Sequence, residues 1–424
     1  MVNITLLQKP FQVSLFWRRY WLILSLIMTS EGKSSNVQTS ANEEAQISTH
    51  GIASFDSLAS LDKPLNQIIP NAASSGEVII VAGGTHTCNL TSGGGVRCWG
   101  ENIYGQLGDG TNDRSSEPKD VVGLDSGITS ISLGYGHTCA ITINGEAKCW
   151  GKNDYGELGD GTTTRRSSPI DVVGLGIGVR ALTGGAAHTC ALTTGGGVKC
   201  WGYNGYGQLG DGTNTDRLTP VGVVGLTSGI TAIAAGGLHT CGLTTAGGVK
   251  CWGENESGGL GDGTTTNSST PVDVVGLTSG ITAIAAGSQH TCALTTGGGV
   301  KCWGYNGYGQ LGDGTNTDRL TPVDVVGLPS GITAIAAGSQ HTCALTDNGG
   351  ILCWGLNSVG QLGNGTIINS SIPVNISGLL SGMTAVTAGA SQSCSLTSSG
   401  GVKIWGGVPF ICGGYLVPAD WEGL

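Results

Sequence analysis

The apolar positions of this chain fall in short segments that alternate with polar positions, and each segment is bounded by glycine, serine or proline. One stretch contains four such segments in succession, at 271–277, 280–287, 290–295 and 299–304. Alternation over four to eight residues between turn-forming residues is typical of β-strands. No segment keeps a helical period over ten or more residues. The pattern therefore predicts an all-β fold.

The group of four segments recurs with a fixed period. Seven cysteines mark it at intervals of 51 residues: Cys88, Cys139, Cys190, Cys241, Cys292, Cys343 and Cys394. Four strands in each of seven such units predict a seven-bladed β-propeller with four strands per blade. A solenoid is the alternative architecture, but solenoids require atypical capping repeats at both ends.

The two ends of the repeat region suggest how the ring closes. The first unit begins in mid-repeat at 77–83, with no Pro-Val strand before it, and 417–424 resembles that missing strand. We therefore expect the C-terminal strand (417–424) to pair with the N-terminal blade. Such pairing would remove the exposed sheet edges that otherwise promote aggregation. The propeller is predicted to occupy residues 76–424.

The residues before the repeats have a different composition. Lys9, Arg18 and Arg19 precede a largely apolar run at 20–28. This run is shorter than the roughly 20 residues that span a bilayer. Residues 1–30 are therefore predicted to be a signal peptide or membrane-targeting segment, with an uncleaved anchor or a misassigned start as the alternative. No stable membrane span is expected, and residues 31–75 have the polar composition of a flexible linker.

Overall composition limits the classes of partner. The chain has 77 glycines in 424 residues, only 11% charged residues and a net charge of −10. The charges are spread along the chain, without a block of like sign. Nucleic-acid binding requires a basic patch, so nucleic acid is not expected as a partner.

A second cysteine follows ten residues after each of the first six. The triple glycine at 297–299 predicts a hairpin turn midway between Cys292 and Cys302, which places the two opposite each other. Facing Cα atoms in an antiparallel pair lie about 4.5–5.5 Å apart, within the range of about 4.4–6.8 Å that a disulfide accepts. We therefore predict these disulfides, which indicate an oxidising compartment: Cys88–Cys98, Cys139–Cys149, Cys190–Cys200, Cys241–Cys251, Cys292–Cys302 and Cys343–Cys353.

Two alternatives and one exception accompany this prediction. Free thiols are one alternative, and a zinc site using His290 with the cysteine pair is the other. Each zinc site would lack a fourth protein ligand, so no metal is predicted. In the seventh unit Ile404 replaces the second cysteine, and Cys412 is the candidate partner of Cys394.

Tryptophan and histidine recur once per unit and are interpreted as parts of the scaffold. The tryptophan after each second cysteine, such as Trp303, is expected to fill an interface between blades. The repeated histidines, such as His290, are expected to be buried and to bond backbone groups of their own or the next blade. A catalytic residue requires a unique constellation, and none stands out from the repeat background. No catalytic residue is therefore predicted.

The repeated segment Gly-Gln-Leu-Gly-Asp-Gly-Thr, as at 207–213 and 309–315, is similar to a phosphate-binding loop. It lacks the Lys-Ser/Thr pair that contacts phosphate and magnesium, and no helix pattern follows it. A calcium loop would need a distal bidentate glutamate, which is absent. The Asp-Gly pairs are explained by turn formation, and no cofactor is predicted.

The motifs Gly-x-x-His-Thr-Cys-Ala-Leu-Thr and Gly-x-Val-Lys-Cys-Trp-Gly-x-Asn-x-x-Gly-Gln-Leu-Gly-Asp-Gly recur, with small departures, in every unit. They resemble the regulator of chromosome condensation repeat. The resemblance implies a seven-bladed propeller, often closed by pairing of the two chain ends. The founding member of that family is a nuclear guanine-nucleotide exchange factor for a small GTPase. Other members are secreted bacterial proteins, among them an inhibitor of β-lactamases, and the paired cysteines are closer to this bacterial branch.

A binding surface is expected where otherwise uniform units differ, which is after each Trp-Gly pair. Tyrosine and arginine are enriched at interface hot spots. The candidate binding residues are Tyr104, Tyr155, Tyr203, Tyr206, Tyr305, Tyr308, Arg217 and Arg319. Packing of these tyrosines on the neighbouring blade is the alternative.

These observations predict a non-catalytic, monomeric propeller that is secreted or at the cell surface and binds a protein or a glycan. A GTPase-regulating exchange factor and a secreted enzyme inhibitor are the alternative functions. No unit carries a lengthened insertion like the wedge of the exchange factor.

Overall fold

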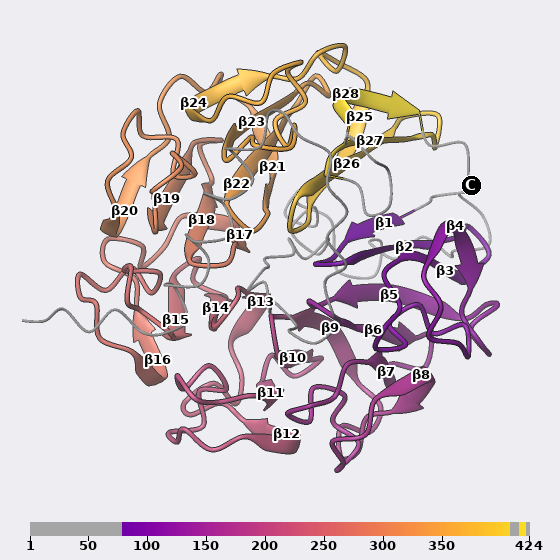
Figure 1. The fold of residues 1–424 in the computed structure, drawn as a ribbon. Coiled ribbons are helices and arrows are strands. Elements are labelled where there is room, and N and C mark those ends of the chain that lie inside the picture. Colours follow the sequence, from indigo (N-terminus) through magenta and orange to yellow (C-terminus); the bar gives the residue numbers. More distant parts are fainter. Residues whose placement is uncertain (1–78, 408–414, 421–424) are drawn as a thin grey trace, which may run out of the picture. The chain divides into compact units, whose positions relative to one another are not determined.

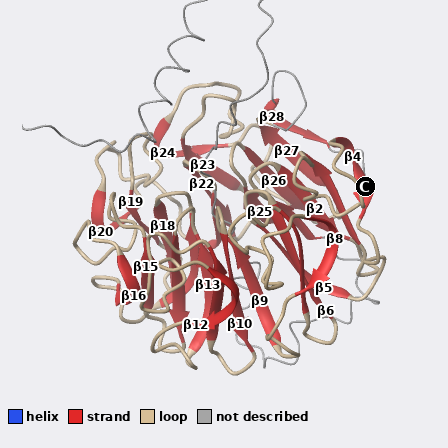
Figure 2. Cartoon of the chain, turned by 60° about the horizontal axis from the view of Figure 1, so that its bottom comes forward, coloured by secondary structure: helices blue, strands red, loops and turns tan. Residues whose placement is uncertain are grey.

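The computed structural model describes residues 79–407 and 415–420. This part of the chain contains 28 strands in seven four-stranded antiparallel sheets. The sheets follow one another around a ring (Figure 1), and strands and loops account for all the described structure (Figure 2). The predicted all-β, seven-bladed propeller with four strands per blade is confirmed. The predicted leader (1–30) and linker (31–75) lie outside the described residues.

Each blade consists of four consecutive strands. Blades 1 to 4 contain β1 (Ile79–Ala82), β2 (His86–Leu90), β3 (Val96–Gly100) and β4 (Ser115–Asp120); β5 (Ile128–Leu133), β6 (His137–Thr142), β7 (Ala147–Gly151) and β8 (Arg166–Asp171); β9 (Val179–Gly184), β10 (His188–Thr193), β11 (Val198–Gly202) and β12 (Arg217–Gly222); β13 (Ile230–Ala235), β14 (His239–Thr244), β15 (Val249–Gly253) and β16 (Ser268–Asp273). Blades 5 to 7 contain β17 (Ile281–Ala286), β18 (His290–Thr295), β19 (Val300–Gly304) and β20 (Arg319–Asp324); β21 (Ile332–Ala337), β22 (His341–Thr346), β23 (Ile351–Gly355) and β24 (Ser370–Asn375); β25 (Met383–Ala388), β26 (Gln392–Thr397), β27 (Val402–Gly406) and β28 (Tyr415–Asp420).

The apolar core lies between neighbouring blades. One cluster joins Val249 and Cys251 of blade 4 to Ile284 and Trp303 of blade 5. Blades are buried on both faces of their first three strands, which explains why β17, β18 and β19 are almost fully buried. The fourth strand is partly exposed. The predicted packing of tryptophan between blades is therefore confirmed.

The predicted closure of the ring, by pairing of the C-terminal strand (417–424) with the N-terminal blade, is wrong. β28 pairs with β27, with Lys403 opposite Asp420 and Ile404 opposite Ala419, so it belongs to blade 7. In every blade the fourth strand, which contains the repeated proline, pairs with the tryptophan strand that precedes it. The segment after that strand then crosses to the next blade, where Val274 and Leu277 join the interblade core. The first unit thus lacks no strand, because blade 1 is complete with β1 to β4.

Packing and hydrogen bonds between blades 7 and 1 close the ring instead. β1 packs against β25 and β26 (Figure 1). The Nε2 of Gln392 donates to the carbonyl oxygen of Gly83 at 3.1 Å, and the backbone N–H of Ala390 donates to the same oxygen at 3.3 Å. An apolar cluster that includes Trp99 and Ile404 fills the interface. Closure therefore rests on side-chain burial and on a few bonds near the ring axis.

Candidate functional site

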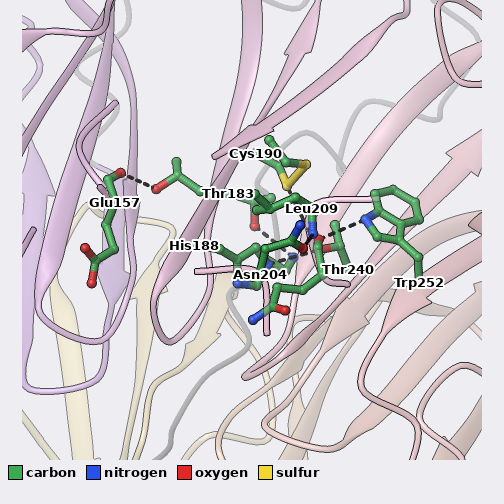
Figure 3. Close-up of a disulfide and its surroundings, with 12 residues drawn as sticks. Glu157, Thr183, His188, Cys190, Asn204, Leu209, Thr240 and Trp252 are labelled. Atoms are coloured by element: carbon green, nitrogen blue, oxygen red, sulfur yellow. Dashed lines mark hydrogen bonds between the residues drawn. A yellow bond between two sulfur atoms is a disulfide. The ribbon is translucent and has the colours of Figure 1, made fainter. Parts of the chain in front are cut away.

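Six blade interfaces contain the same hydrogen-bond network, in which a threonine takes part at five of them and Ser393 at the sixth. Between blades 3 and 4, His188 Nε2 lies 2.9 Å from the hydroxyl of Thr240, and that hydroxyl donates to the carbonyl oxygen of Gln208 at 3.0 Å. Trp252 Nε1 donates to the same carbonyl at 2.9 Å (Figure 3). The network thus joins a histidine and a loop carbonyl of one blade to a threonine and a tryptophan of the next.

The network fixes the protonation of the histidines. The threonine hydroxyl has one proton, which it donates to the carbonyl, so it must accept from a protonated Nε2. Burial lowers the pKa of His188 to about 3, and the pKa values of the other five histidines fall to about 3 or 4 for the same reason. These side chains are neutral at physiological pH. The predicted burial is confirmed, but the bonding partner is a hydroxyl of the next blade rather than a backbone group.

The glycines of the Gly-Gln-Leu-Gly-Asp-Gly loops allow this close approach. In blade 4, Gly261 has φ of 69°, and a Cβ on it would lie 2.7 Å from Trp303 Nε1. Any other residue there would displace the indole ring from its carbonyl partner. The following aspartate makes a turn: Asp262 accepts from the backbone N–H and the hydroxyl of Thr264. These bonds support the interpretation of the segment as turn chemistry.

The six predicted disulfides of blades 1 to 6 are confirmed. Their Cα atoms are 4.1 Å apart, somewhat closer than expected, and each pair stands directly opposite in the second and third strands. Cys394 is different, because it faces Ile404 and is a buried free thiol. The candidate disulfide between Cys394 and Cys412 is therefore not formed. Cys412 itself lies outside the described residues. Among the residues of the seven sheets and their joining loops, no group of three His, Cys, Asp or Glu could hold a metal ion.

Cys302→Ile would reproduce in blade 5 the unbridged pair of blade 7. We expect the free energy of unfolding to fall by roughly 2.5 kcal/mol, because the closed ten-residue loop no longer restricts the unfolded chain. Denaturant unfolding of the wild type and the variant without reductant measures the loss. The difference should shrink when both proteins are unfolded under strong reduction. An undiminished difference would show that packing, and not the bridge, is responsible.

The six candidate tyrosines lie in four of the six loops that join the third and fourth strands of blades 1 to 6, and Arg217 and Arg319 directly follow two of these loops. We call the six loops the loop rim: 101–114, 152–165, 203–216, 254–267, 305–318 and 356–369. Tyr104 is buried, with 7% of its surface exposed, while the other five tyrosines are partly exposed. Tyr155 and Tyr203 are in contact across the interface of blades 2 and 3, with ring centroids 4.8 Å apart. Tyr155 and Tyr203 therefore pack on the neighbouring loop, and five of the six tyrosines keep part of their surface exposed.

The two candidate arginines begin β12 and β20, and each is held by an aspartate of the rim loop that precedes it. Arg217 pairs with Asp211 at 2.7 Å, and Arg319 pairs with Asp313 at 2.7 Å. Both aspartates are nearly buried, and the arginines are about one-third exposed. The guanidinium groups therefore stabilise the turns, and their charges are already compensated.

The loop rim carries an excess of negative charge. Together with the first residue of each following strand, it contains six basic residues, Arg114, Lys152, Arg165, Arg166, Arg217 and Arg319. It contains thirteen acidic residues, Glu101, Asp109, Asp113, Asp154, Glu157, Asp160, Asp211, Asp216, Glu254, Glu256, Asp262, Asp313 and Asp318. The rim is therefore aromatic and acidic.

Three buried charged residues of the rim are absent from the sequence-based candidates. Lys152, Glu157 and Glu254 have exposed fractions of 5%, 0% and 3%. Burial raises the pKa values of both glutamates to about 7. Comparison of the repeats could have identified these residues. Glu157 stands where four other units have glutamine. Lys152 and Glu254 occupy the same repeat position with opposite charges.

A model of the RCC1-like domain matches residues 172–411, more than half of the chain. Models of the regulator of chromosome condensation (RCC1) repeat match 78–106 and 128–157, and also 93–141 and 144–192. The chain belongs to the RCC1 repeat family. The resemblance seen in the sequence motifs is thereby confirmed.

Several RCC1-family relatives are similar over most of this chain. The ultraviolet-B receptor UVR8 of Arabidopsis thaliana is 35% identical over 306 residues, which cover 70% of this chain and 69% of UVR8. The mitochondrial RCC1 domain-containing protein RUG3 of the same plant is 33% identical, covering 73% of this chain and 76% of RUG3. The human E3 ubiquitin-protein ligase HERC2 is 31% identical, but the match covers only 8% of its length.

Solved structures support the RCC1-type fold. Yeast RCC1 (Prp20), in its complex with Kap60, gives a TM-score of 0.68 at 23% identity and covers 76% of this chain and 82% of its own. Human WBSCR16 gives the same TM-score at 22% identity, covering 77% and 94%. At these identities the likeness concerns the fold. Within residues 79–407 and 415–420, no helix is long and apolar enough to cross a membrane.

Proposed function

We propose that this RCC1-type propeller is a non-catalytic scaffold that binds a partner protein through the loop rim. The observation that carries the proposal is the contrast between the constant interior and the variable rim. The histidine networks repeat at six interfaces, while the rim positions after each Trp-Gly pair change from blade to blade. Partly exposed tyrosines beside carboxylates offer both contact area and charge, which suits a protein better than a glycan.

The proposed location is extracellular, either secreted or at the cell surface. Six disulfides in one propeller are typical of proteins that fold in an oxidising compartment. The basic and apolar residues at 9–28 add a secretory-type sequence pattern.

The exchange-factor and inhibitor functions are the alternatives. Each of the six rim loops has fourteen residues, so the described blades offer no enlarged loop to enter a GTPase. An extracellular location also argues against a nuclear exchange factor. A secreted enzyme inhibitor remains compatible with the proposal, since it would be one form of protein binding.

Replacing rim tyrosines is expected to weaken partner capture strongly. We propose to immobilise the wild type and a Tyr203→Ala/Tyr206→Ala/Tyr305→Ala/Tyr308→Ala variant and to compare the proteins that each captures from culture medium. The control replaces three exposed apolar residues on the opposite face with alanine, Ile143, Ile177 and Leu380. Capture should fall at least tenfold for the rim variant and stay unchanged for the control. Equal capture by the wild type and the rim variant would exclude the rim as the binding surface.

A further inference from the structure

The same tyrosine position has different surroundings at successive blade interfaces. Tyr104, Tyr155, Tyr206 and Tyr308 stand at one position of the repeat, 51 or 102 residues apart. After Tyr104, Tyr155, Tyr206 and Tyr308 the next blade supplies, at one shared repeat position, Lys152, Tyr203, Glu254 and Leu356 respectively. Comparison of these interfaces shows which tyrosine rings have a lysine or arginine of the chain itself beside them.

At the interface of blades 1 and 2, the chain supplies its own cations. Lys152 Nζ lies 5.6 Å from the ring centroid of Tyr104 and 6.0 Å from that of Tyr155. The guanidinium of Arg165 lies 4.5 Å from the Tyr104 centroid and pairs with Asp154 through two bonds, at 2.8 and 3.1 Å. Tyrosine rings within about 6 Å of a cation attract it. This interface is therefore an internal example of a filled aromatic-acidic cation site.

At the interface of blades 3 and 4, the corresponding cations are missing. Glu254 stands in the position of Lys152, and Asn267 stands in the position of Arg165. The Tyr206 ring contacts Tyr203 edge to face, with centroids 6.3 Å apart at 70°. In the described blades, Lys152 and Arg165 lie over the rings of Tyr104 and Tyr155, and no lysine or arginine lies over the ring of Tyr206.

Two carboxylates provide the negative charge at this second interface. Glu254 stands at the repeat position from which Lys152 reaches the Tyr104 ring. In agreement with this placement, burial first, and then the charges of Glu256 and Glu254, raise the pKa of the Tyr206 hydroxyl. Glu254 is 3% exposed and accepts a bond from Gln289 Nε2 at 3.2 Å, while Glu256 is exposed. An incoming cation would compensate a buried carboxyl whose own pKa burial raises to about 7.

We propose that Tyr206, Glu254 and Glu256 form a binding site for a lysine or arginine side chain from a basic segment of the partner protein. This inference rests on the proposed function and specifies the chemistry of its partner. The partner's cation would contact the Tyr206 ring as Lys152 and Arg165 contact the Tyr104 ring, with Glu254 and Glu256 as its counter-charges. Arg217 does not fill the site, because Asp211 holds its guanidinium.

Blade 5 provides a matched control within the same molecule. Tyr305 and Tyr308 repeat the geometry of Tyr203 and Tyr206, with centroids 6.1 Å apart at 75°. The next blade, however, has Leu356 and Ser358 in the positions of the two glutamates. The Tyr308 interface thus has the same aromatic pair without the carboxylates, and it should bind cations weakly.

Binding of a fluorescein-labelled hexa-arginine peptide tests the site, with the uncharged hexa-citrulline peptide as the probe for non-ionic binding. Fluorescence anisotropy at constant ionic strength should show hexa-arginine binding to the wild type and at least a tenfold larger Kd for Tyr206→Ala. Tyr308→Ala should change Kd less than twofold. Glu254→Lys, which copies the internal cation of blade 2, should weaken binding at least tenfold. Glu146→Lys makes the same charge change in an exposed turn at the opposite ends of the strands and should have little effect.

Glu256→Gln removes an exposed charge without a change in the core, so it tests the site even if Glu254→Lys fails to fold. It should raise Kd about threefold or more. Equal effects of the two tyrosine substitutions, or of the two lysine substitutions, would overturn the inference in favour of general attraction to an acidic surface. Absence of hexa-arginine binding would also overturn it. If partner capture still depends on the rim tyrosines in that case, the proposed function stands and only the cation site is wrong.

Discussion

Trp303→Ala is expected to lower the free energy of unfolding by roughly 3–5 kcal/mol, the range found for truncation of buried large aromatic side chains. The Trp303 side chain is fully buried and packs on Val274 and Leu277 in the core between blades 4 and 5. Its Nε1 also donates to the carbonyl oxygen of Gly259 at 2.9 Å. The substitution therefore opens a cavity and removes one bond that joins the two blades.

Trp303→Phe separates these two contributions. Phenylalanine keeps much of the aromatic contact but has no N–H donor. The Gly259 carbonyl would still accept the hydroxyl of Thr291 at 3.0 Å, so the hydrogen-bond loss should be near 1 kcal/mol. Denaturant unfolding under non-reducing conditions measures both variants. A loss of unfolding free energy below 1 kcal/mol for Trp303→Ala would contradict the conclusion that this ring is a major part of the packing between blades.

Glu157→Gln is expected to stabilise the protein by about 3 kcal/mol at pH 8 and to have little effect near pH 4.5. Glu157 is completely buried, and its Oε2 accepts the backbone N–H of Tyr155 at 2.8 Å. Burial is the main cause that raises its pKa from 4.5 to about 7, while Lys152 lowers it and Asp154 raises it. Each unit of pKa difference corresponds to about 1.4 kcal/mol.

The direction follows from the proton balance. Below pH 4.5 the carboxyl is protonated in both the folded and the unfolded chain. Between pH 4.5 and about 7 the unfolded chain releases the proton while the folded chain retains it, so wild-type stability falls as the pH rises. Above pH 7 the folded protein carries the full cost of a buried charge. Glutamine has no such cost, and it already occupies this position in other units, as Gln106 and Gln208 show.

Unfolding at pH 5 and pH 8 measures this effect. The stability difference between the variant and the wild type should grow with pH. The stability of the variant should still depend on pH, but less than that of the wild type. The remaining dependence comes from Glu254, because burial raises its pKa in the same way. The same stability difference at both pH values would mean that the pKa of Glu157 is equal in the folded and unfolded chain, which would contradict this account.

The number of blades and the four strands of each blade could be predicted from the sequence, because a strict sequence period indicates structurally identical units. The hairpin between Cys292 and Cys302 needed only local information, namely the triple glycine between two short strands. The blade boundaries did not follow, because a period of 51 residues is the same wherever the repeat is cut. Assigning the Pro-Val strand to the following blade rather than the preceding one produced the wrong closure for β28.

The residues of the proposed binding surface were only partly predictable. Tyr203 and Tyr206 were found because they vary among uniform loops. Lys152 and Glu254 were missed because a charged residue in a glycine-rich loop is usually solvated, whereas here the neighbouring blade buries it. Such burial depends on contacts between residues about 50 positions apart, which strand periodicity does not report.

Hydrogen–deuterium exchange of the propeller, alone and with the protein that it captures, tests the central claim most directly. The account predicts slower exchange on binding in the rim loops 203–216 and 254–267, and unchanged exchange in the opposite-face turn at 296–299. Protection confined to that opposite face, with the rim loops unchanged, would contradict it.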